Sequence, residues 1–146
     1  MFMGPWDQGG PWSSSGISGI VRFLGRVWTL ALDPTGREPG DPESGKLPSG
    51  EDSAAAELRV RRAAHRAIAG VGADMEAFRF NTAVAKLMEL ANVLFRYRGS
   101  EIAGGAAWSE AIGMLLRALA PMAPHLAEEM HARLQAANGV GDGSAG

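Results

Sequence analysis

The sequence contains no cysteine, which excludes disulfide bonds and thiolate metal sites. It has only two lysines, Lys46 and Lys86, and we attribute the dominance of arginine among the cations to genomic composition. No apolar run approaches the roughly 20 residues that a membrane-spanning helix needs. The first residues also lack the basic and apolar regions of a signal peptide. We therefore expect a cytoplasmic protein that does not enter a membrane.

The remaining composition is that of an ordinary globular domain. The chain has 146 residues, of which 46% are hydrophobic and 21% are charged. This length accommodates one domain with a substantial core. The net charge of −2 does not by itself indicate a nucleic-acid partner. Local cationic patches matter more, because phosphate contacts come from clustered side chains.

The first half of the sequence predicts two helices separated by a loop. No segment shows the sustained alternation of β-strands, whereas several repeat with the period of a helix. Ser13, Ser14 and Ser15 supply capping hydroxyls for the first helix. Its apolar stripe comprises Ile17, Ile20, Val21, Leu24, Trp28 and Ala31. Proline, glycine and acidic residues crowd the predicted loop, residues 33–51. A second helix is expected from Asp52 or Ser53 to Gly70 or Gly72.

The second half predicts three further helices. We expect Asp74 to cap a third helix that runs to about Tyr97. Trp108 lies on the apolar stripe of a fourth helix, and Trp108, like Trp28, is predicted to be a core residue. Pro124 suits the first turn of a fifth, short helix. The sequence thus predicts an all-α bundle of four long helices plus a short terminal one, over residues 16–137, and a disordered tail, 138–146.

No residue pattern predicts catalysis, a cofactor site or a metal site within this chain. His65, His125 and His131 do not form a ligand set with metal-binding spacing. Glu128 and His131 have the spacing of a bundle di-metal motif, but the second copy that such a site requires is absent. The serines near position 14 have no nearby base, and the glycines lack a strand–loop–helix phosphate signature.

Two groups of arginines are candidates for contacts with an anionic partner. Arg59, Arg62 and Arg66 share one face of the second helix, and Arg22 and Arg26 lie opposite the apolar stripe of the first. From the sequence alone, the simpler interpretation is a solvated surface with local ion pairing.

Three segments, in order, resemble leucyl-tRNA synthetase, a class I aminoacyl-tRNA synthetase. They are Phe2–Ser13 with the following Gly16-Ile17 and Arg22–Trp28, then His65 with Phe78–Asn92, and finally Leu119–Glu129. The first segment is the most specific to the leucine enzyme. One departure is that Met130-His131 stands where the family continues with Leu-Trp. The family's two adenylate-forming motifs, its editing domain and its small C-terminal domain are absent from this chain.

The resemblance implies the helical anticodon-binding domain of a class I synthetase, with residues 1–15 as an interdomain joint from a missing catalytic domain. In the full enzyme it implies ATP-dependent leucylation of tRNA(Leu) with ATP and Mg²⁺. This chain would bind no cofactor and would be inactive alone. Its expected partners are tRNA(Leu) and the catalytic portion, encoded by the same gene or a separate chain, and not DNA. The tRNA contacts it implies are Arg22, Arg26, Arg59, Arg62 and Arg66.

An alternative from another class stays open at this point. The chain could be a stand-alone helical module that binds other proteins. Exposed Trp6 and Trp12 near the start would favour this interpretation, because they would offer a hydrophobic docking patch.

Overall fold

The computed structural model describes residues 14–37, 39–42, 44–48 and 50–139. Within these ranges the chain forms only helices and connecting segments, which confirms the predicted all-α fold. The helices are α1 (Ser14–Leu32), α2 (Ser53–Glu76), α3 (Phe80–Tyr97), α4 (Ala106–Leu119) and α5 (Pro124–Gly139). The predicted interdomain joint falls almost entirely outside the described residues, as does most of the predicted tail.

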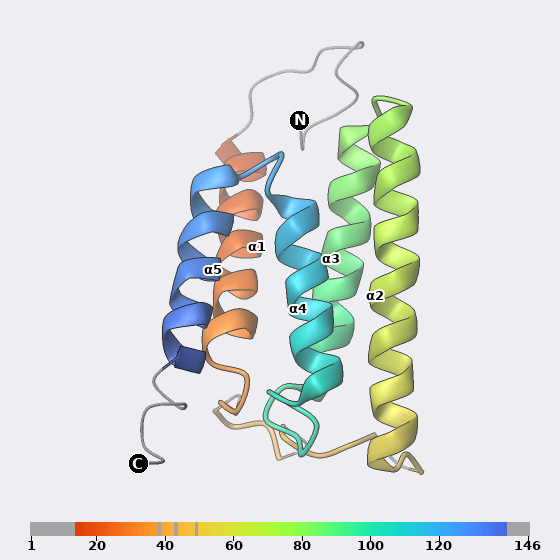
Figure 1. Cartoon of the computed structure of the whole chain (residues 1–146), viewed down its shortest axis with the longest axis vertical. Coiled ribbons are helices and arrows are strands. Elements are labelled where there is room, and N and C mark those ends of the chain that lie inside the picture. Colours follow the sequence, from red (N-terminus) through yellow and green to blue (C-terminus); the bar gives the residue numbers. More distant parts are fainter. Residues whose placement is uncertain (1–13, 38, 43, 49, 140–146) are drawn as a thin grey trace.

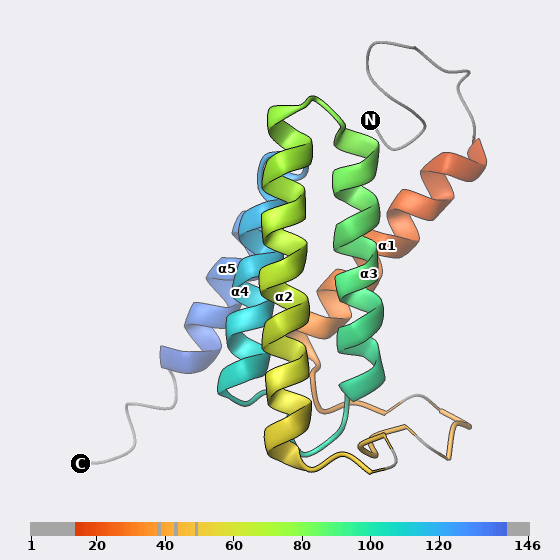
Figure 2. The same ribbon diagram turned by 90° about the vertical axis from the view of Figure 1, so that its right-hand side faces the viewer.

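The helices form a bundle in which α4 occupies the middle. Figure 1 shows α1 and α5 side by side at one edge and α2 and α3 at the other. Turned by a quarter, α2 and α3 stand in front, while α1 crosses behind α3 and α4 lies behind α2 (Figure 2). The principal contacts of α2 are with α3 and α4. One long helix therefore presents one side to α3 and another to α4.

Small side chains let α2 pack closely against these neighbours. Its buried stripe consists of Ala56, Val60, Ala64, Ala67 and Val71, which recur at helical spacing. The facing core is built from larger residues of α3 and α4, including Leu87, Leu90, Leu94 and Leu115, all at most 1% exposed. Alanine also has the highest helix propensity. The same residues therefore favour both the helix and its close packing.

The predicted boundary between the second and third helices is wrong. α2 begins as expected, with Asp52 accepting a hydrogen bond from the backbone N–H of Ala55 at 2.8 Å. It does not stop at Gly70 or Gly72 but continues to Glu76. Asp74, expected to cap α3, lies inside α2 and is 2% exposed. The glycines were misleading because one of them has a packing role.

Gly70 makes room for a charged side chain from α3. A Cβ at this position would lie 2.8 Å from Cδ of Lys86. Lys86 donates a hydrogen bond to the Gly70 carbonyl at 3.4 Å and forms an ion pair with Asp74. Arg79 also pairs with Asp74, at 3.3 Å. These contacts tie the end of α2 to the start of α3, and tertiary packing thereby overrides the local glycine signal.

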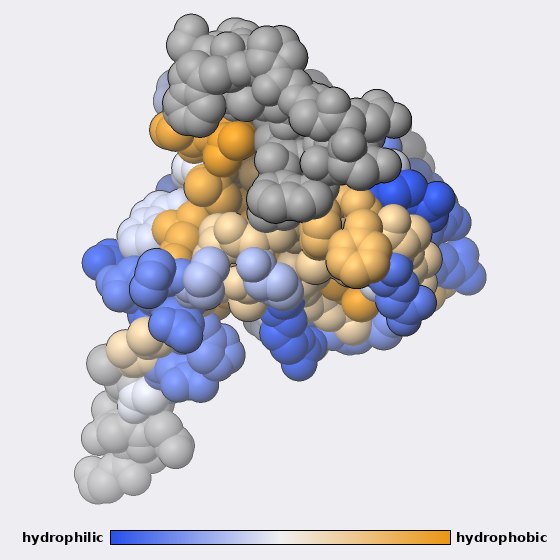
Figure 3. All heavy atoms as spheres, turned by 90° about the horizontal axis from the view of Figure 1, so that it is seen from above, coloured by the Kyte–Doolittle hydropathy of each residue, from blue (hydrophilic) through white to orange (hydrophobic). Residues whose placement is uncertain are grey.

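The turn between α2 and α3 holds an exposed aromatic residue. Phe78 has a φ of 57°, a left-handed conformation that bulky residues rarely adopt. Its side chain is 72% exposed and meets Phe80 edge-on, with 6.1 Å between ring centroids. Val21, in the second turn of α1, is 64% exposed. Figure 3 views this end of the bundle and shows apolar residues at the surface.

The fourth and fifth helices follow the predicted pattern with one difference in length. Trp108 is 2% exposed and Trp28 packs against the core, as predicted. α5 begins at Pro124, as expected, but has 16 residues, two more than α4. It is therefore not a short terminal helix. Arg133 of α5 lies over the Trp28 ring, with its guanidinium 4.8 Å from the centroid. This contact helps to join α5 to α1.

The loop between α1 and α2 is attached to the end of α3. Arg98, 8% exposed, donates to the carbonyl of Asp33 at 2.9 Å and to its carboxylate at 2.7 Å. The backbone N–H of Gly99 donates to the carbonyl of Pro34 at 2.8 Å. The predicted loop is thus confirmed, and its start is fixed to the bundle.

Candidate functional site

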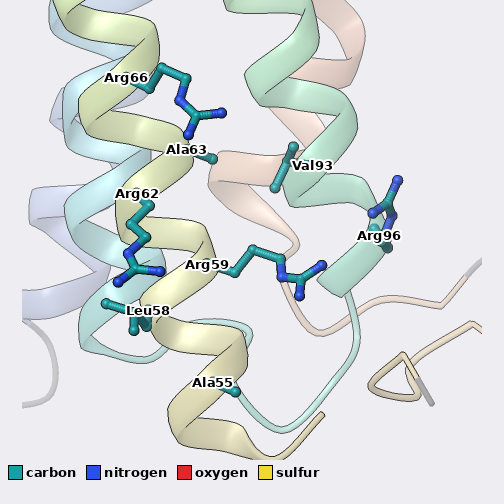
Figure 4. Close-up of a pocket in the computed structure, with 8 residues that line it drawn as sticks. All are labelled: Ala55, Leu58, Arg59, Arg62, Ala63, Arg66, Val93 and Arg96. Carbon is teal, nitrogen blue, oxygen red and sulfur yellow. The ribbon is translucent and has the colours of Figure 1, made fainter. Parts of the chain in front are cut away.

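A strongly cationic concave surface lies between α2 and α3. It is a hollow of about 460 Å³ lined by Ala55, Leu58, Arg59, Arg62, Ala63, Arg66, Val93 and Arg96. Spacings of three and four residues place the three α2 arginines on neighbouring turns of one face. Figure 4 shows Arg59 reaching from α2 towards Arg96 on α3. Two helices therefore contribute cations to one hollow.

A second hollow, of about 220 Å³, continues the first along the same helices. The two share Ala63, Arg66 and Val93. The second adds Lys86 and the acidic Glu89. We call the two hollows together the α2/α3 groove. Its lining thus carries five cationic side chains and one carboxylate.

The cations of the groove differ in how they are neutralised. Arg59 lies 2.7 Å from a carboxylate oxygen of Glu51, and Lys86 pairs with Asp74. In the part of the chain that the structure describes, Arg62, Arg66 and Arg96 form no ion pair, and all three are exposed. These three guanidinium groups are therefore available to an external anion.

The floor of the groove is apolar and built from small side chains. Ala55 and Ala63 contribute no bulk, and Val93 is half-buried. Leu58 is 47% exposed at one end. An extended polymer with regularly spaced negative charges can approach such a floor closely while those charges contact the arginines at the sides. Guanidinium groups bind phosphate or carboxylate oxygens through paired N–H donors. This arrangement suits binding of an extended anion.

The structure does not bring all five predicted arginines together. Arg59, Arg62 and Arg66 line the groove, whereas Arg22 and Arg26 do not. Arg22 is exposed on α1. Arg26 is half-buried, and its guanidinium lies 4.4 Å from the centroid of the Phe95 ring of α3. Its charge is engaged in a cation–π contact between α1 and α3. The two arginine groups are therefore separate surfaces.

Sequence reasoning missed the contribution of α3. Arg96 lies in the last turn of that helix, where a cation is expected for its favourable interaction with the helix dipole. Lys86 falls among the apolar residues of the same helix. Neither position signals an interface with α2, because helical periodicity does not reveal which faces of two helices meet. Their spacing within α3 could have indicated only that both lie near one side of that helix.

Two other polar clusters have identifiable roles in the fold. A hydrogen bond from Lys86 lowers the pKa of Asp74, and Arg79 acts in the same direction. On the side of α2 that faces α4, a hydrogen bond from Arg61 lowers the pKa of Glu110, assisted by His65. Within the described ranges, no group of three His, Asp or Glu side chains is placed to hold a metal ion. The histidines therefore have no common site.

Among the described residues, no helix combines the length and the apolar character that a bilayer crossing requires.

The family described as the anticodon-binding domain of tRNA ligase matches residues 59–143 of this chain. The match starts at Arg59 and therefore includes every α2 and α3 cation of the groove. Among solved structures, the ternary complex of Agrobacterium radiobacter K84 agnB2 LeuRS with tRNA and LeuAMS is similar, with a TM-score of 0.65 and 29% identity. The similarity covers 84% of this chain and 15% of that one.

Curated relatives are leucine–tRNA ligases. That of Herpetosiphon aurantiacus is 42% identical over 130 residues, which are 89% of this chain and 14% of the relative. That of Dehalococcoides mccartyi (strain 195) is 41% identical over 134 residues, 92% of this chain and 15% of the relative. That of Rubrobacter xylanophilus is 43% identical over 130 residues, with 89% and 14% covered. The chain thus spans about one seventh of the length of these relatives.

Proposed function

The chain belongs to the anticodon-binding domain family of tRNA ligases, and from this membership we propose that it is the helical domain with which a leucine–tRNA ligase positions tRNA(Leu). Identities of 41–43% to leucine–tRNA ligases support leucine as the amino acid. The similar solved complex contains tRNA, which supports tRNA as the partner. In the class I enzyme the reaction would be ATP-dependent leucylation of tRNA.

The observation that carries this proposal is the α2/α3 groove with its unpaired Arg62, Arg66 and Arg96. Three exposed guanidinium groups around an apolar floor fit a phosphodiester backbone, in which successive negative charges follow one another. Structured RNA is recognised mainly through shape and backbone contacts. The groove would therefore position the tRNA rather than read its bases.

The chemistry would belong to the catalytic portion of the ligase, as a further part of the same polypeptide or a separate chain. ATP and Mg²⁺ would bind to the catalytic portion, and that portion and this chain would act in the cytoplasm. The described residues supply cations and apolar surface in the groove but no nucleophile with an adjacent base. We expect the 146-residue chain alone to give no ATP–pyrophosphate exchange with leucine. Measurable exchange by the purified chain would contradict this assignment.

A salt titration of tRNA binding tests the proposal. Labelled tRNA(Leu) transcript would be titrated with the chain at several salt concentrations by fluorescence anisotropy. Three phosphate contacts predict a slope of log K against log salt of about −2 to −3, from roughly −0.7 to −0.9 per contact. Binding that is absent even at low salt, or that is independent of salt, would contradict a phosphate-binding groove.

A second candidate function, a module that docks on another protein, has its own supporting observation. Phe78 and Val21 are large apolar residues exposed at one end of the bundle. If tRNA does not bind at low salt, this candidate gains. An apolar interface would then strengthen or stay constant as salt rises, whereas phosphate contacts weaken.

A further inference from the structure

Glu51 places a negative charge beside the cations of the α2/α3 groove. This residue ends the loop that precedes α2, and its side chain is 10% exposed. One carboxylate oxygen, Oε1, lies 2.7 Å from Nε of Arg59. The other, Oε2, accepts a hydrogen bond from the Tyr97 hydroxyl at 2.7 Å. The carboxylate therefore connects the loop to both helices that form the groove.

Tyr97 fixes the position of this carboxylate. Its side chain is fully buried at the end of α3, where the hydroxyl has Glu51 as its partner. Burial, reinforced by the hydrogen bond to Glu51, raises the pKa of Tyr97 to about 12. The hydroxyl consequently stays protonated at physiological pH and remains a donor. Glu51 is thus held in place independently of Arg59.

The contact between Glu51 and Arg59 is a charge contact without a directed hydrogen bond. Oε1 is buried and has no hydrogen-bond partner among the described residues, although Nε of Arg59 lies 2.7 Å away. The side chain of Arg59 is 58% exposed. Its guanidinium is therefore neutralised by Glu51 while most of its surface still faces solvent. Among the described residues, Arg62, Arg66 and Arg96 have no such carboxylate.

We propose that Glu51 is an internal competitor that limits the affinity of the α2/α3 groove for the phosphates of tRNA by pairing with the positive charge of Arg59. This inference rests on the proposed tRNA-binding function. An RNA phosphate that paired with Arg59 would have to compete with a carboxylate whose position is fixed. Displacing Arg59 would also leave buried Oε1 without its counter-charge, which is unfavourable. Arg59 therefore contributes little to RNA binding, whereas the three unpaired arginines supply most of it.

The test is the variant Glu51→Gln, which removes the charge and keeps an oxygen that can accept from Tyr97. It frees Arg59, so the affinity for labelled tRNA(Leu) transcript at about 50 mM salt rises roughly threefold to tenfold. The slope of log K against log salt becomes steeper by about 0.7 to 0.9, the value of one phosphate contact. Arg59→Ala alone leaves affinity near that of the wild type. Adding Arg59→Ala to Glu51→Gln abolishes the gain.

A matched control is Glu57→Gln, which removes the same charge from a nearby position within α2. Glu57 is 3.8 Å from Arg61, and Arg61 retains Glu110 at 2.9 Å, so no groove cation is released. We expect Glu57→Gln to bind as the wild type does. An equal gain in both glutamine variants would mean a general charge effect and would overturn the inference.

The binding measurements distinguish the role of Glu51 from the proposed tRNA-binding function of the groove. If the wild type binds tRNA but Glu51→Gln does not change the affinity, Glu51 is not a competitor. The same holds if Arg59→Ala weakens binding as much as Arg62→Ala does. If neither the wild type nor any variant binds at low salt, the proposed tRNA-binding function fails, and the inference fails with it. Circular dichroism of each variant verifies that the bundle is intact.

Discussion

Both sides of α2 carry basic side chains, but these side chains differ in how they are paired. Towards α4, Arg61 lies 2.9 Å from Glu110 and His65 is 3.0 Å from the same carboxylate. Towards α3, Arg62 and Arg66 form no ion pair among the described residues, and α3 adds Arg96. Helix α4 thus pairs basic residues of α2 with a carboxylate, whereas α3 adds Arg96 and leaves Arg62 and Arg66 without an ion pair among the described residues.

This difference shows that arginine content alone does not account for the positive charge of the groove. A bias towards arginine explains why the helix has four arginines, but it does not explain where the carboxylates are. Like charges that face one another across a groove disfavour the compact state and create a positive potential that attracts anions. The pairing on the α4 side shows that this fold can neutralise arginine where an acid is provided. The unpaired side is accordingly the one suited to a polyanionic ligand.

The largest effect on tRNA affinity is expected when the exposed cations of the groove are removed. Arg62→Ala, Arg66→Ala and Arg96→Ala together should weaken tRNA binding about a hundredfold, because each exposed charge contact contributes roughly 1 kcal/mol. The salt slope should become shallower by about 2 to 3. Anisotropy titrations over a range of salt concentrations measure both quantities.

The control for this triple variant has the same change in net charge. Arg61, Arg117 and Arg133 lie outside the groove, and replacing these three by alanine should leave tRNA affinity within about twofold, because exposed contacts elsewhere contribute little. Similar losses in both triple variants would show that overall charge, not the groove, governs binding.

The sequence predicts the arginine face of α2 that lines the groove. Residues three and four apart on a helix are neighbours, which places Arg59, Arg62 and Arg66 on a common face, and in the structure all three line one hollow. Arg96 could not be assigned to the same site, since even the nearest α2 arginine of the groove, Arg66, lies 30 residues earlier in the sequence. The unpaired state of the cations was equally inaccessible, because it depends on which acids the neighbouring helices present.

A smaller effect, on stability and not on tRNA binding, is expected at the hydrogen bond between Tyr97 and Glu51. Tyr97→Phe removes the hydrogen bond to Glu51, and we expect the free energy of unfolding to fall by about 1 kcal/mol. The folded-state pKa of Tyr97 is raised from 10.0 to about 12, so its stabilisation is fully present below pH 10. It is lost as pH rises from about 10 towards about 12.

Urea denaturation at several alkaline pH values measures this effect. The wild type should lose its advantage over Tyr97→Phe in that window. A difference between the two proteins that stays constant up to pH 12 would show that the hydroxyl is not the titrating group.

The smallest effect is expected on the paired side. Glu110→Gln removes the partner of Arg61 and His65 and should lower the midpoint of thermal unfolding by a few degrees, since the pair is partly exposed. The pKa of Glu110 is lowered from 4.5, so its contribution is present above that pH and is lost as pH falls through the lower folded-state value.

Thermal melts at neutral and acidic pH check this expectation. The two proteins should begin to converge as pH falls below about 4.5 and should converge fully only below the lowered folded-state pKa of Glu110. Binding of tRNA should stay unchanged or rise slightly, because Arg61 keeps only Glu57, at 3.8 Å. A large loss of tRNA affinity in Glu110→Gln would contradict the distinction between the two sides of α2.

The fold itself was more predictable than the site. The apolar periodicity of the first four helices is local and predicts each of them, and Pro124 predicts the start of the fifth. Errors arose where long-range packing reversed a local signal, as at Gly70, which admits Lys86, and at Asp74, which pairs inside the bundle instead of capping α3. The last helix is predicted to be short, yet it extends to Gly139 and buries Ala127 and Met130. Its contacts with α1 and α4 thus support a longer helix than the sequence predicts.

The loop between α1 and α2 is attached at both ends to consecutive residues of one helix end. Arg98 fixes its start through Asp33, and Tyr97 fixes its end through Glu51. Its ends therefore keep their separation whatever lies between them, and doubling the loop length would cost only about 0.6 kcal/mol of closure entropy. Gly40 is exposed and has open space around it, but its φ of 84° favours glycine, so the suitable change there is an insertion and not a substitution. This segment is thus a position where a fluorophore-bearing peptide or an affinity tag can be inserted while the arginines of the groove stay in place.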